Sequence, residues 1–386
     1  MYIPYGRQNI DQHDIDAVIE VLRSDFLTQG ALVPDFENCV ARYCGSEYAV
    51  ATNSATSALH LACLALGVGP GDVVWTTPLT FVASANCALY CGAKVDFVDI
   101  DPATLNISLV ELEEKLSKAK KNGALPKVII PVHFTGNACD MAGIRKLSFQ
   151  YGFKVIEDAS HAIGGSYENK KIGNCKYSDI TIFSFHPVKI ITTGEGGMAV
   201  CNNKKLAAQM QLLRSHGITR DSSSMTHEPD GAWYYQQIEL GFNYRMTELQ
   251  AALGLSQMQR IEDFISRRNV IAQRYDDAFK GKHLEIHEHP NKGQSSLHLY
   301  IVQLKLSEIT RSHKEVFDCM RKLGIGVNLH YIPVHLHPYY LALGFQPGDF
   351  VVAEKYYQRA ISLPIYYGLT DKEQQKVIDS LCGLIQ

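Results

Sequence analysis

The sequence has no excess of basic residues and no long hydrophobic run. Its 37 Lys and Arg residues stand against 40 Asp and Glu residues, for a formal net charge of −3. Nucleic acids and anionic membrane surfaces select basic patches, so we expect neither as a partner. The densest basic stretch, KLSKAKKNGALPK (residues 115–127), is interpreted as the solvated end of a helix and its exit loop.

Membrane and metal signals are missing as well. No run approaches the roughly 18 apolar residues of a membrane helix, and the N-terminus, MYIPYGRQNIDQHD, lacks the charged segment and apolar core of a signal peptide. The ten cysteines form no C-x-x-C pair and no Cys/His group at zinc spacing. We therefore predict free thiols, no metal site, and a reducing, cytoplasmic location.

What is present is a repeated alternation of strand and helix. Short apolar runs, each followed by a helical pattern, are DVVWTT (72–77), AKVDFVDI (93–100), KVIIPVHF (127–134) and KVIEDAS (154–160). This order predicts an α/β fold with a mostly parallel sheet covered by helices on both faces. ITIFSF and GGMAVC follow with little helix between them and depart from the alternation.

The regular alternation of strand and helix ends near residue 250. Residues 239–279 have the pattern of one long helix; HLYIVQL is then predicted as a strand, and SHKEVFDCMRKLG, AEKYYQRAISL and DKEQQKVIDSLCGLI as helices. We predict a large α/β domain over residues 1–250 and a smaller α+β domain over 251–386. The polar loop RDSSSMTHEPDGAW (220–233) either lies over a site or is an ordinary surface loop.

In a parallel sheet, ligands bind beyond the carboxyl ends of the strands. The loop NSATSALH (53–60) enters a helix through small and hydroxylated residues, which suits a phosphate but also describes an ordinary helix cap. Phe81, in PLTFVASA, is either a core residue or a stacking platform for a flat ring.

Two further loops carry ionisable groups. KVIEDAS ends in Glu157 and Asp158, with His161 three residues on. A carboxylate there could bind a metal, act as a base or pair with a protonated ring nitrogen. In FSFHPVK, Ser184 ends a strand and Lys189 follows it; a desolvated lysine can attack a carbonyl to form a Schiff base. Together these groups are typical of a pyridoxal 5′-phosphate (PLP) site.

The stretches LTQGALVPDFE, ATNSATSALHLA, TTPLTFVASANCALYCGAKVDFVDID, VIEDASHAIGG, SFHPVKIITTGEGG, GFNYRMTELQAALGLSQ and HYIPVH span nearly the whole chain. With them the chain resembles the DegT-like sugar-nucleotide aminotransferases of the fold-type I, aspartate-aminotransferase-like PLP enzymes.

The resemblance implies roles for individual residues at the cofactor. Lys189 matches the catalytic Schiff-base lysine, which also moves the proton. Asp158 matches the acid that pairs with the pyridine nitrogen, and His161 a Gln/His position beside the cofactor's phenolic oxygen. Phe81 matches the aromatic residue that stacks on the ring.

The phosphate and substrate positions are implied in the same way. Thr56, its neighbour Ser57, and Ser184 match phosphate contacts. Asn243 matches an asparagine that reaches the phosphate in the neighbouring subunit, which implies a homodimer with shared active sites. The residues that match the substrate side are Thr28, Gln29, His330 and Tyr331.

The lysine also separates two branches of the family. A PLP dehydratase branch has histidine in its place; here Lys189 is present and His186 lies three positions earlier, which favours transamination. GRQNIDQHDIDAVIEVLRSDFLTQG and SSLHLYIVQL, among other stretches, most resemble the branch that serves pseudaminic acid synthesis for flagellin. The implied substrates are L-glutamate and a UDP-4-keto-6-deoxy sugar. Alternatives are another UDP-, dTDP- or GDP-linked keto sugar, or a PLP-binding regulatory protein without turnover.

Overall fold

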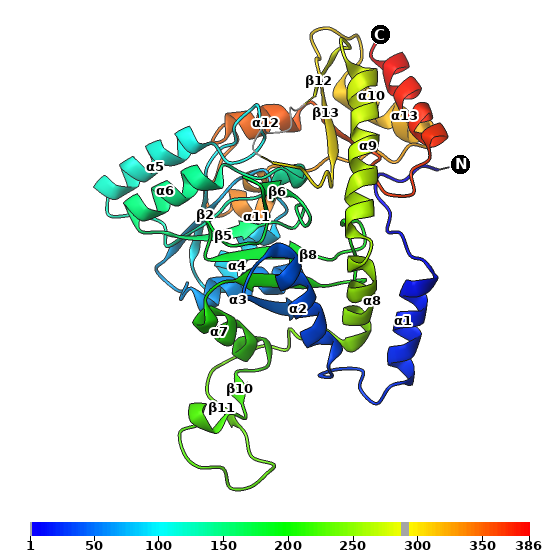
Figure 1. Cartoon of the computed structure of the whole chain (residues 1–386). Helices are drawn as coiled ribbons and strands as arrows, with labels where there is room; N and C mark the ends of the chain where they lie inside the picture. Colours follow the sequence, from blue (N-terminus) through cyan, green and yellow to red (C-terminus); the bar gives the residue numbers. More distant parts are fainter. Residues whose placement is uncertain (1, 287–292) are drawn as a thin grey trace.

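A seven-stranded sheet forms the centre of the molecule (Figure 1). The computed structural model describes residues 2–286 and 293–386. The strand order is β1-β9-β8-β5-β4-β2-β3, and β9 runs antiparallel to both of its neighbours. The strands are β1 (Tyr48–Thr52), β2 (Val73–Thr76), β3 (Lys94–Phe97), β4 (Val128–Ile130), β5 (Lys154–Asp158), β8 (Ile180–Ser184) and β9 (Gly197–Cys201). The predicted α/β fold is confirmed, and the departure at ITIFSF and GGMAVC is the antiparallel β8–β9 pair.

Helices cover both faces because side chains alternate along each strand. Val50 and Ile156 pack into the cluster under α3, α4 and α7. Their neighbours Ala51 and Val155 face the clusters under α2, α8, α5 and α6. These helices are α2 (Leu32–Cys44), α3 (Ala55–Ala65), α4 (Ala83–Tyr90), α5 (Leu109–Lys121), α6 (Met141–Tyr151), α7 (Lys204–Arg214) and α8 (Glu248–Met258).

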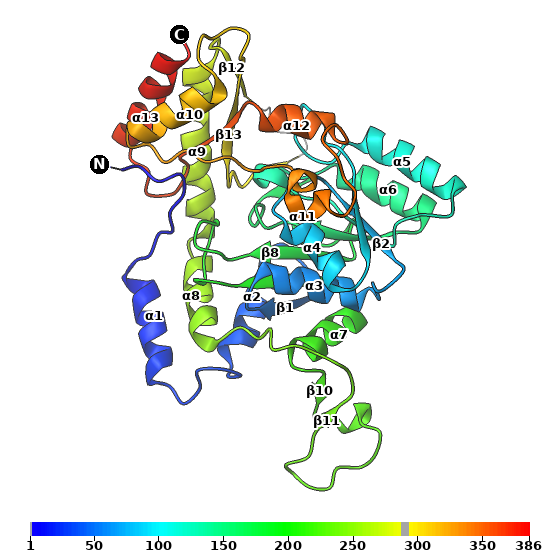
Figure 2. The same cartoon turned by 180° about the vertical axis from the view of Figure 1, so that it is seen from behind.

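The single long helix predicted for residues 239–279 is two helices. α8 begins only after Thr247, whose hydroxyl accepts the N–H of Gln250 in a capping box, and α9 (Ile261–Phe279) starts after a break at Gln259 and Arg260. The two helices lie end to end in one column in both views (Figures 1 and 2). α1 (Gln12–Arg23), capped by Asp11, lies beside α8.

A second, three-stranded sheet follows in the C-terminal part. It consists of β12 (Leu284–Ile286), β13 (Tyr300–Leu304) and β14 (Ala360–Leu363), with α10 (His313–Lys322) and α13 (Asp371–Leu384) packed nearby. The helix predicted over AEKYYQRAISL is wrong in its second half: α12 (Val351–Tyr357) ends and residues 360–363 form β14. All four are buried and pair with β13, so sheet pairing overrides the local helical pattern.

Packing crosses the predicted boundary at residue 250 in two places. Ile3 forms a β-bridge with Ile325 and joins the C-terminal cluster, and both chain ends lie near α13 (Figure 2). Conversely, α11 (Pro338–Leu341) and α12 add Tyr340 and Tyr356 to the cluster on the large sheet. The division into domains at 250 stays a prediction.

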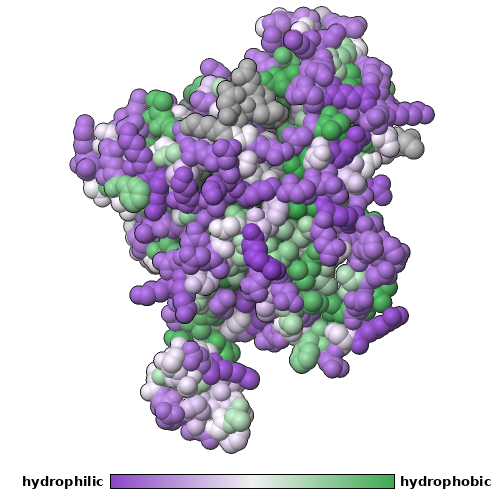
Figure 3. All heavy atoms as spheres, viewed as in Figure 1, coloured by the Kyte–Doolittle hydropathy of each residue, from purple (hydrophilic) through white to green (hydrophobic). Residues whose placement is uncertain are grey.

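An arm protrudes from the body between α7 and α8. It contains the paired strands β10 (Ile218–Thr219) and β11 (Gln236–Gln237) and includes the polar loop 220–233. Figure 3 shows it as a lobe joined to the body by a narrow neck. Trp233 and Leu240 are 74% and 82% exposed. Across the described residues, no helix has the length and apolar character needed to cross a membrane.

Candidate active site

A cavity of about 960 Å³ opens at the carboxyl ends of the parallel strands. The loops after β1, β2, β5 and β8 line it, together with residues 328–331 of the C-terminal part. This is the edge at which α/β sheets bind ligands. Of the residues predicted from the sequence, the cavity collects Thr56, Ser57, Phe81, Asp158, His161, Ser184, Lys189, His330 and Tyr331.

The turn from β1 into α3 forms a cradle for an anion. The Ser54 hydroxyl caps α3 by accepting the N–H of Ser57 at 3.2 Å, and the Ser57 hydroxyl donates to Asn53 at 2.6 Å. The N–H groups of Ala55 and Thr56 have no partner within the helix because they belong to its first turn. Such a helix start suits a phosphate, so Thr56 is the better placed of the two phosphate contacts predicted in this turn.

Gly197 lets this cradle sit directly on the sheet. A Cβ atom there would lie 2.5 Å from the backbone nitrogen of Ala55 and from the carbonyl carbon of Ser54. Gly197 pairs with Ser184 across β8 and β9, so the predicted phosphate residue Ser184 is adjacent to the cradle. A side chain at 197 would collide with the backbone of the cradle.

Asp158 ends β5 as a buried and oriented carboxylate. Ser84 donates its hydroxyl to Oδ2 at 2.6 Å, and the N–H of Ser160 donates to Oδ1 at 3.0 Å. A carboxylate held on two sides keeps lone pairs for one further donor, such as a protonated ring nitrogen. Glu157 points to the other side of β5, where it pairs with His133 at 2.6 Å and accepts from Thr181. The two carboxylates therefore do not act together.

Lys189 lies in the turn after β8, where its backbone N–H donates to the carbonyl of His186 at 2.9 Å. Burial lowers the pKa of its amine from 10.5 to about 8, against the attraction of Asp158, which raises it. At pH 7 a group with a pKa of 8 is neutral in about 9% of molecules, compared with about 0.03% at 10.5. The neutral amine is the nucleophile that Schiff-base chemistry needs.

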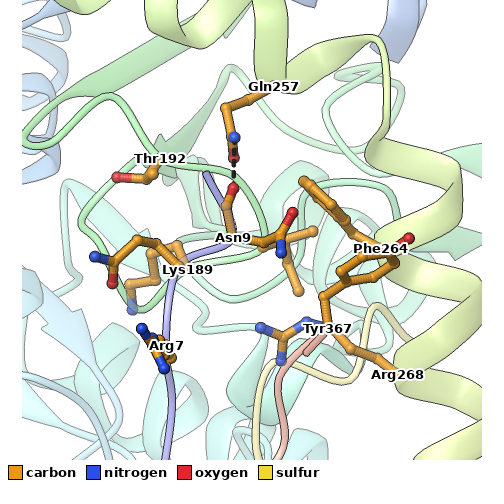
Figure 4. A pocket seen from close by; sticks show the side chains of 10 residues that line it. Arg7, Asn9, Lys189, Thr192, Gln257, Phe264, Arg268 and Tyr367 are labelled. Atoms are coloured by element: carbon orange, nitrogen blue, oxygen red, sulfur yellow. Dashed lines mark hydrogen bonds between the residues drawn. The ribbon is translucent and has the colours of Figure 1, made fainter. Parts of the chain in front are cut away.

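The opposite side of Lys189 faces a second, small space. It has room for about one water, 10 Å³, and is lined by Arg7, Asn9, Gln257 and Arg268, among others (Figure 4). Gln257 Nε2 donates to the carbonyl of Asn9 at 2.9 Å and so fixes the N-terminal segment there. Lys189 therefore lies between this small space and the large cavity.

His161 lies beside the cavity in a cluster of rings. Its Nε2 is 3.1 Å from the Tyr331 hydroxyl, and its ring centroid is 4.4 Å from that of His298. Burial, and then the charge of Lys189, hold the pKa of both imidazoles well below the usual range, so both are neutral. His161 Nδ1 is buried without a partner among the described residues. A cofactor oxygen would satisfy it.

His298 is a cavity residue that the sequence did not reveal. It lies in the segment before β13, where HLYIVQL predicts only a strand, and no local pattern marks it. Arg268, buried on α9, donates to the carbonyls of Leu297 and His298 at 3.2 and 3.3 Å and to that of Ile365. The backbone that carries the ring is therefore held by a residue far away in the sequence.

Phe81 is an exposed aromatic residue at the cavity, not a core residue. It is 59% exposed, and its ring lies 6.2 Å from that of Tyr331.

His330 is buried, and its Nδ1 lies 2.8 Å from the Ser362 hydroxyl. Burial, and then the charge of Lys189, lower the pKa of His330 to about 3. The roles of these residues toward cofactor and sugar stay predictions.

Three predicted residues do not line this cavity. Thr28 and Gln29 are exposed in the loop between α1 and α2, and Asn243 is exposed at the base of the arm, where it forms a bridge with Ser215. Their predicted roles, which for Asn243 involve a neighbouring subunit, remain predictions. In the part of the chain that the structure describes, no group of three or more His, Cys, Asp or Glu side chains is placed to hold a metal ion.

The chain matches known proteins over its whole length. The model of the DegT/DnrJ/EryC1/StrS aminotransferase family matches residues 8–382. The UDP-4-amino-4,6-dideoxy-N-acetyl-β-L-altrosamine transaminase of Campylobacter jejuni (strain 81-176) is 39% identical, covering 100% of this chain and 98% of its own. The GDP-perosamine synthase of Caulobacter vibrioides is 35% identical, covering 98% and 97%.

A solved structure agrees with the sequence relatives. Helicobacter pylori PseC, an aminotransferase of pseudaminic acid biosynthesis, superposes with a TM-score of 0.90 at 32% identity, covering 100% of this chain and 99% of its own. The predicted fold-type I architecture and PLP dependence are confirmed. This chain belongs to the DegT/DnrJ/EryC1/StrS aminotransferase family.

Proposed function

We propose that this aminotransferase moves the amino group of L-glutamate to C4 of UDP-2-acetamido-2,6-dideoxy-β-L-arabino-hex-4-ulose. The product is UDP-4-amino-4,6-dideoxy-N-acetyl-β-L-altrosamine, a precursor in pseudaminic acid synthesis for flagellin glycosylation. The observation that carries this choice is the 39% identity, over the whole chain, to a transaminase named for that product.

The residues of the cavity fit PLP, and each would hold a different part of it. The first turn of α3 and Ser184 would hold the phosphate, Phe81 would lie against the ring, and Asp158 would keep a proton on the ring nitrogen. When bound, PLP supplies a carbonyl carbon for amine exchange and an electron-accepting ring.

Lys189 carries the proton chemistry. Its lowered pKa leaves a fraction of the amine neutral at pH 7, so Nζ can act as nucleophile and, once free, as the base that takes a proton at one carbon and returns it at another. Because Lys189 approaches from one side of the cavity, the face at which Nζ delivers the proton sets the configuration at C4. The neutral imidazole of His161 is available to donate a hydrogen bond without adding charge beside the amine.

We also propose a cytoplasmic homodimer with shared active sites. Asn243 and the apolar residues of the arm are exposed in the single chain. The family resemblance implies that Asn243 reaches the cofactor phosphate of the neighbouring subunit. Light scattering of the purified protein measures the assembly, and a monomer at working concentration would contradict this part.

A second candidate is the same reaction on a different nucleotide sugar. The 35% identity to a GDP-perosamine synthase favours it, and the cavity residues named above do not read a nucleotide base. A PLP-binding protein without turnover is disfavoured because Lys189, Asp158 and the cradle meet in one cavity. It would gain support if glutamate never converted bound PLP to its amine form.

The test is a substrate panel. The purified enzyme receives ¹⁵N-labelled L-glutamate and, separately, UDP-, dTDP- and GDP-linked 4-keto-6-deoxy sugars, and mass spectrometry and NMR identify any aminated product. We expect the UDP-β-L-arabino sugar to be aminated with the highest kcat/KM. No product from that sugar, with turnover of another, would overturn the choice of substrate and leave the aminotransferase assignment standing.

A further inference from the structure

Two hydroxyl groups in the turn from β2 into α4 form a hydrogen-bonded chain that ends on Asp158. The hydroxyl oxygens of Thr80 and Ser84 are 2.7 Å apart, and Ser84 donates to Asp158 Oδ2 at 2.6 Å. All three residues are buried. Thr80 and Asp158 also line the large cavity. No step of the proposed function uses Thr80 or Ser84.

The direction of this chain follows from the number of hydrogens available. Each hydroxyl carries one hydrogen, so Ser84 can donate fully to one acceptor only. Its other acceptor, the carbonyl of Phe81, is 3.4 Å away, whereas Asp158 Oδ2 is 2.6 Å away, the distance of a charge-assisted O–H···O⁻ bond. Ser84 therefore donates to Asp158, and Thr80 donates to Ser84. Two hydroxyl dipoles in series point at one carboxylate oxygen.

The rest of Asp158 is held as firmly as Oδ2. The N–H of Ser160 donates to Oδ1 at 3.0 Å. In the backbone, the N–H of Asp158 donates to the carbonyl of Pro131 at 2.9 Å, and its carbonyl accepts the N–H of His133 at 3.0 Å. The strand end is therefore fixed, and the carboxylate can turn only if the bond from Ser84 or the bond from Ser160 is lost.

A force that would turn the carboxylate is present in the same cavity. Asp158 attracts the amine of Lys189 and raises its pKa, and attraction between opposite charges is strong where water is excluded. Among the described residues, however, no ion pair with N···O within 4.0 Å joins Lys189 to Asp158. A direct ion pair would keep the amine protonated and would occupy the carboxylate, so both groups would be lost to a ligand in the cavity.

We propose that Thr80 and Ser84 are positioning residues that hold the Asp158 carboxylate away from Lys189, so that each group stays available to the cofactor. The inference rests on the proposed PLP site, in which Asp158 pairs with the ring nitrogen and Lys189 attacks the carbonyl carbon. The turn that carries the two hydroxyls also carries Phe81, whose carbonyl accepts the backbone N–H of Ser84 at 3.2 Å. One turn thus orients both the aromatic residue expected at the ring and the carboxylate expected at its nitrogen.

Loss of the Ser84 hydroxyl should raise the pH at which Lys189 captures PLP. With Oδ2 released, the carboxylate turns toward the amine, and an opposite charge at close range raises the pKa of an amine by about one unit or more. Capture at pH 7 should then slow about tenfold, because the neutral fraction of the amine falls from about 9% to about 1%. The other ionisable groups around Lys189 stay as in the wild type: Tyr5, His161, His186, Glu195, His298, His330 and Tyr331 at the large cavity, and Arg7, Arg268 and Tyr367 at the small space.

The experiment follows PLP capture against pH in the full-length, cofactor-free protein. Ser84→Ala should raise the midpoint by about one pH unit or more. Ser84→Ala combined with Asp158→Asn should not raise it, because the carboxylate that would turn is gone. Thr80→Val keeps the shape of the side chain but cannot donate, so it should raise the midpoint by a smaller amount. The matched control is Ser148→Ala, which removes another buried helix hydroxyl, one that donates to the carbonyl of Phe153 at 2.7 Å, and should leave the midpoint unchanged.

The outcomes separate this inference from the proposed function. An unmoved or lowered midpoint in Ser84→Ala, or a rise that persists in the double variant, would overturn the positioning role while PLP capture by the wild type leaves the proposed function standing. A wild type that never captures PLP at Lys189 would overturn the proposed function instead. The crystal structure of cofactor-free Ser84→Ala, or of Thr80→Val if only that variant folds, decides the positioning role independently. The Asp158 carboxylate should lie within roughly 4 Å of the Lys189 amine, and a carboxylate in its wild-type position would refute the inference.

Discussion

Replacing Lys189 with methionine should make the cofactor-free protein more stable, although it removes the amine that we propose to be catalytic. Methionine keeps the length of the side chain but carries no charge. Burial lowers the pKa of Lys189 from 10.5 to about 8, which means that the folded state disfavours the charged amine. That fall corresponds to about 3 kcal/mol of lost stability wherever the lysine is charged in both the folded and the unfolded state.

The sign and the pH window follow from the two pKa values. Below pH 8 the amine is charged in both states, so the full cost is present; between pH 8 and 10.5 the folded state releases the proton first and the cost shrinks. The pKa of about 8 already includes the attraction of Asp158, so we expect a net gain of about 3 kcal/mol at pH 7. For a chain of this size that is a rise in Tm of about 2–4 °C.

Thermal unfolding of the cofactor-free protein at pH 6.5, 7.5, 9 and 10 measures this difference. The control is Lys146→Met, which changes an exposed lysine and should shift Tm by under about 1 °C at every pH. The reasoning fails if Lys189→Met is no more stable than the wild type at pH 7, or if its advantage persists unchanged at pH 10.

Three further predictions concern the same cavity. The rate at which Lys189 captures added PLP in the cofactor-free enzyme should rise with pH around a midpoint near 8 and then level off, as followed by stopped-flow absorbance; a midpoint near 10.5 would show that the amine is not desolvated. Asp158→Asn should slow the half-reaction with L-glutamate at least about 100-fold. Because the carboxylate raises the pKa of Lys189, the variant should also lower the pH midpoint of PLP capture. An unchanged midpoint would contradict the electrostatic interaction between Asp158 and Lys189. Gly197→Ala should weaken PLP binding at least about tenfold in a fluorescence titration, because its Cβ would lie 2.5 Å from the cradle backbone. The control is Gly6→Ala, whose Cβ would be 3.6 Å from Val188 and which should bind PLP normally. Equal affinities of the two variants for PLP would refute the role of Gly197.

The large sheet could be predicted from the sequence because each of its strands is a short apolar run with its own boundary. The same rule placed Asp158, Ser184 and Lys189 at strand ends, and these side chains meet in the cavity. The prediction failed at residues 360–363, where four buried residues form a strand only because β13 lies beside them. Local propensity does not record such a partner.

The break between α8 and α9 and the position of His298 were missed for a related reason. The apolar pattern continues through Gln259 and Arg260, so periodicity alone does not mark the end of α8. His298 reaches the cavity because Arg268, thirty residues earlier, holds the backbone around it. Contacts between distant segments decide both features, and a single sequence carries no local signal of them.

Arg268 links one wall of the cavity to the C-terminal part of the molecule. One guanidinium nitrogen ties α9 to the carbonyls of Leu297, His298 and Ile365, and His298 in turn packs against His161. Arg268 therefore connects the segments beside β13 and β14 to the imidazole of His161 beside Lys189. Arg268→Lys would keep the charge but replace the rigid guanidinium with a flexible ammonium, so the position of His298 in the cavity depends on a residue that does not itself touch the cavity.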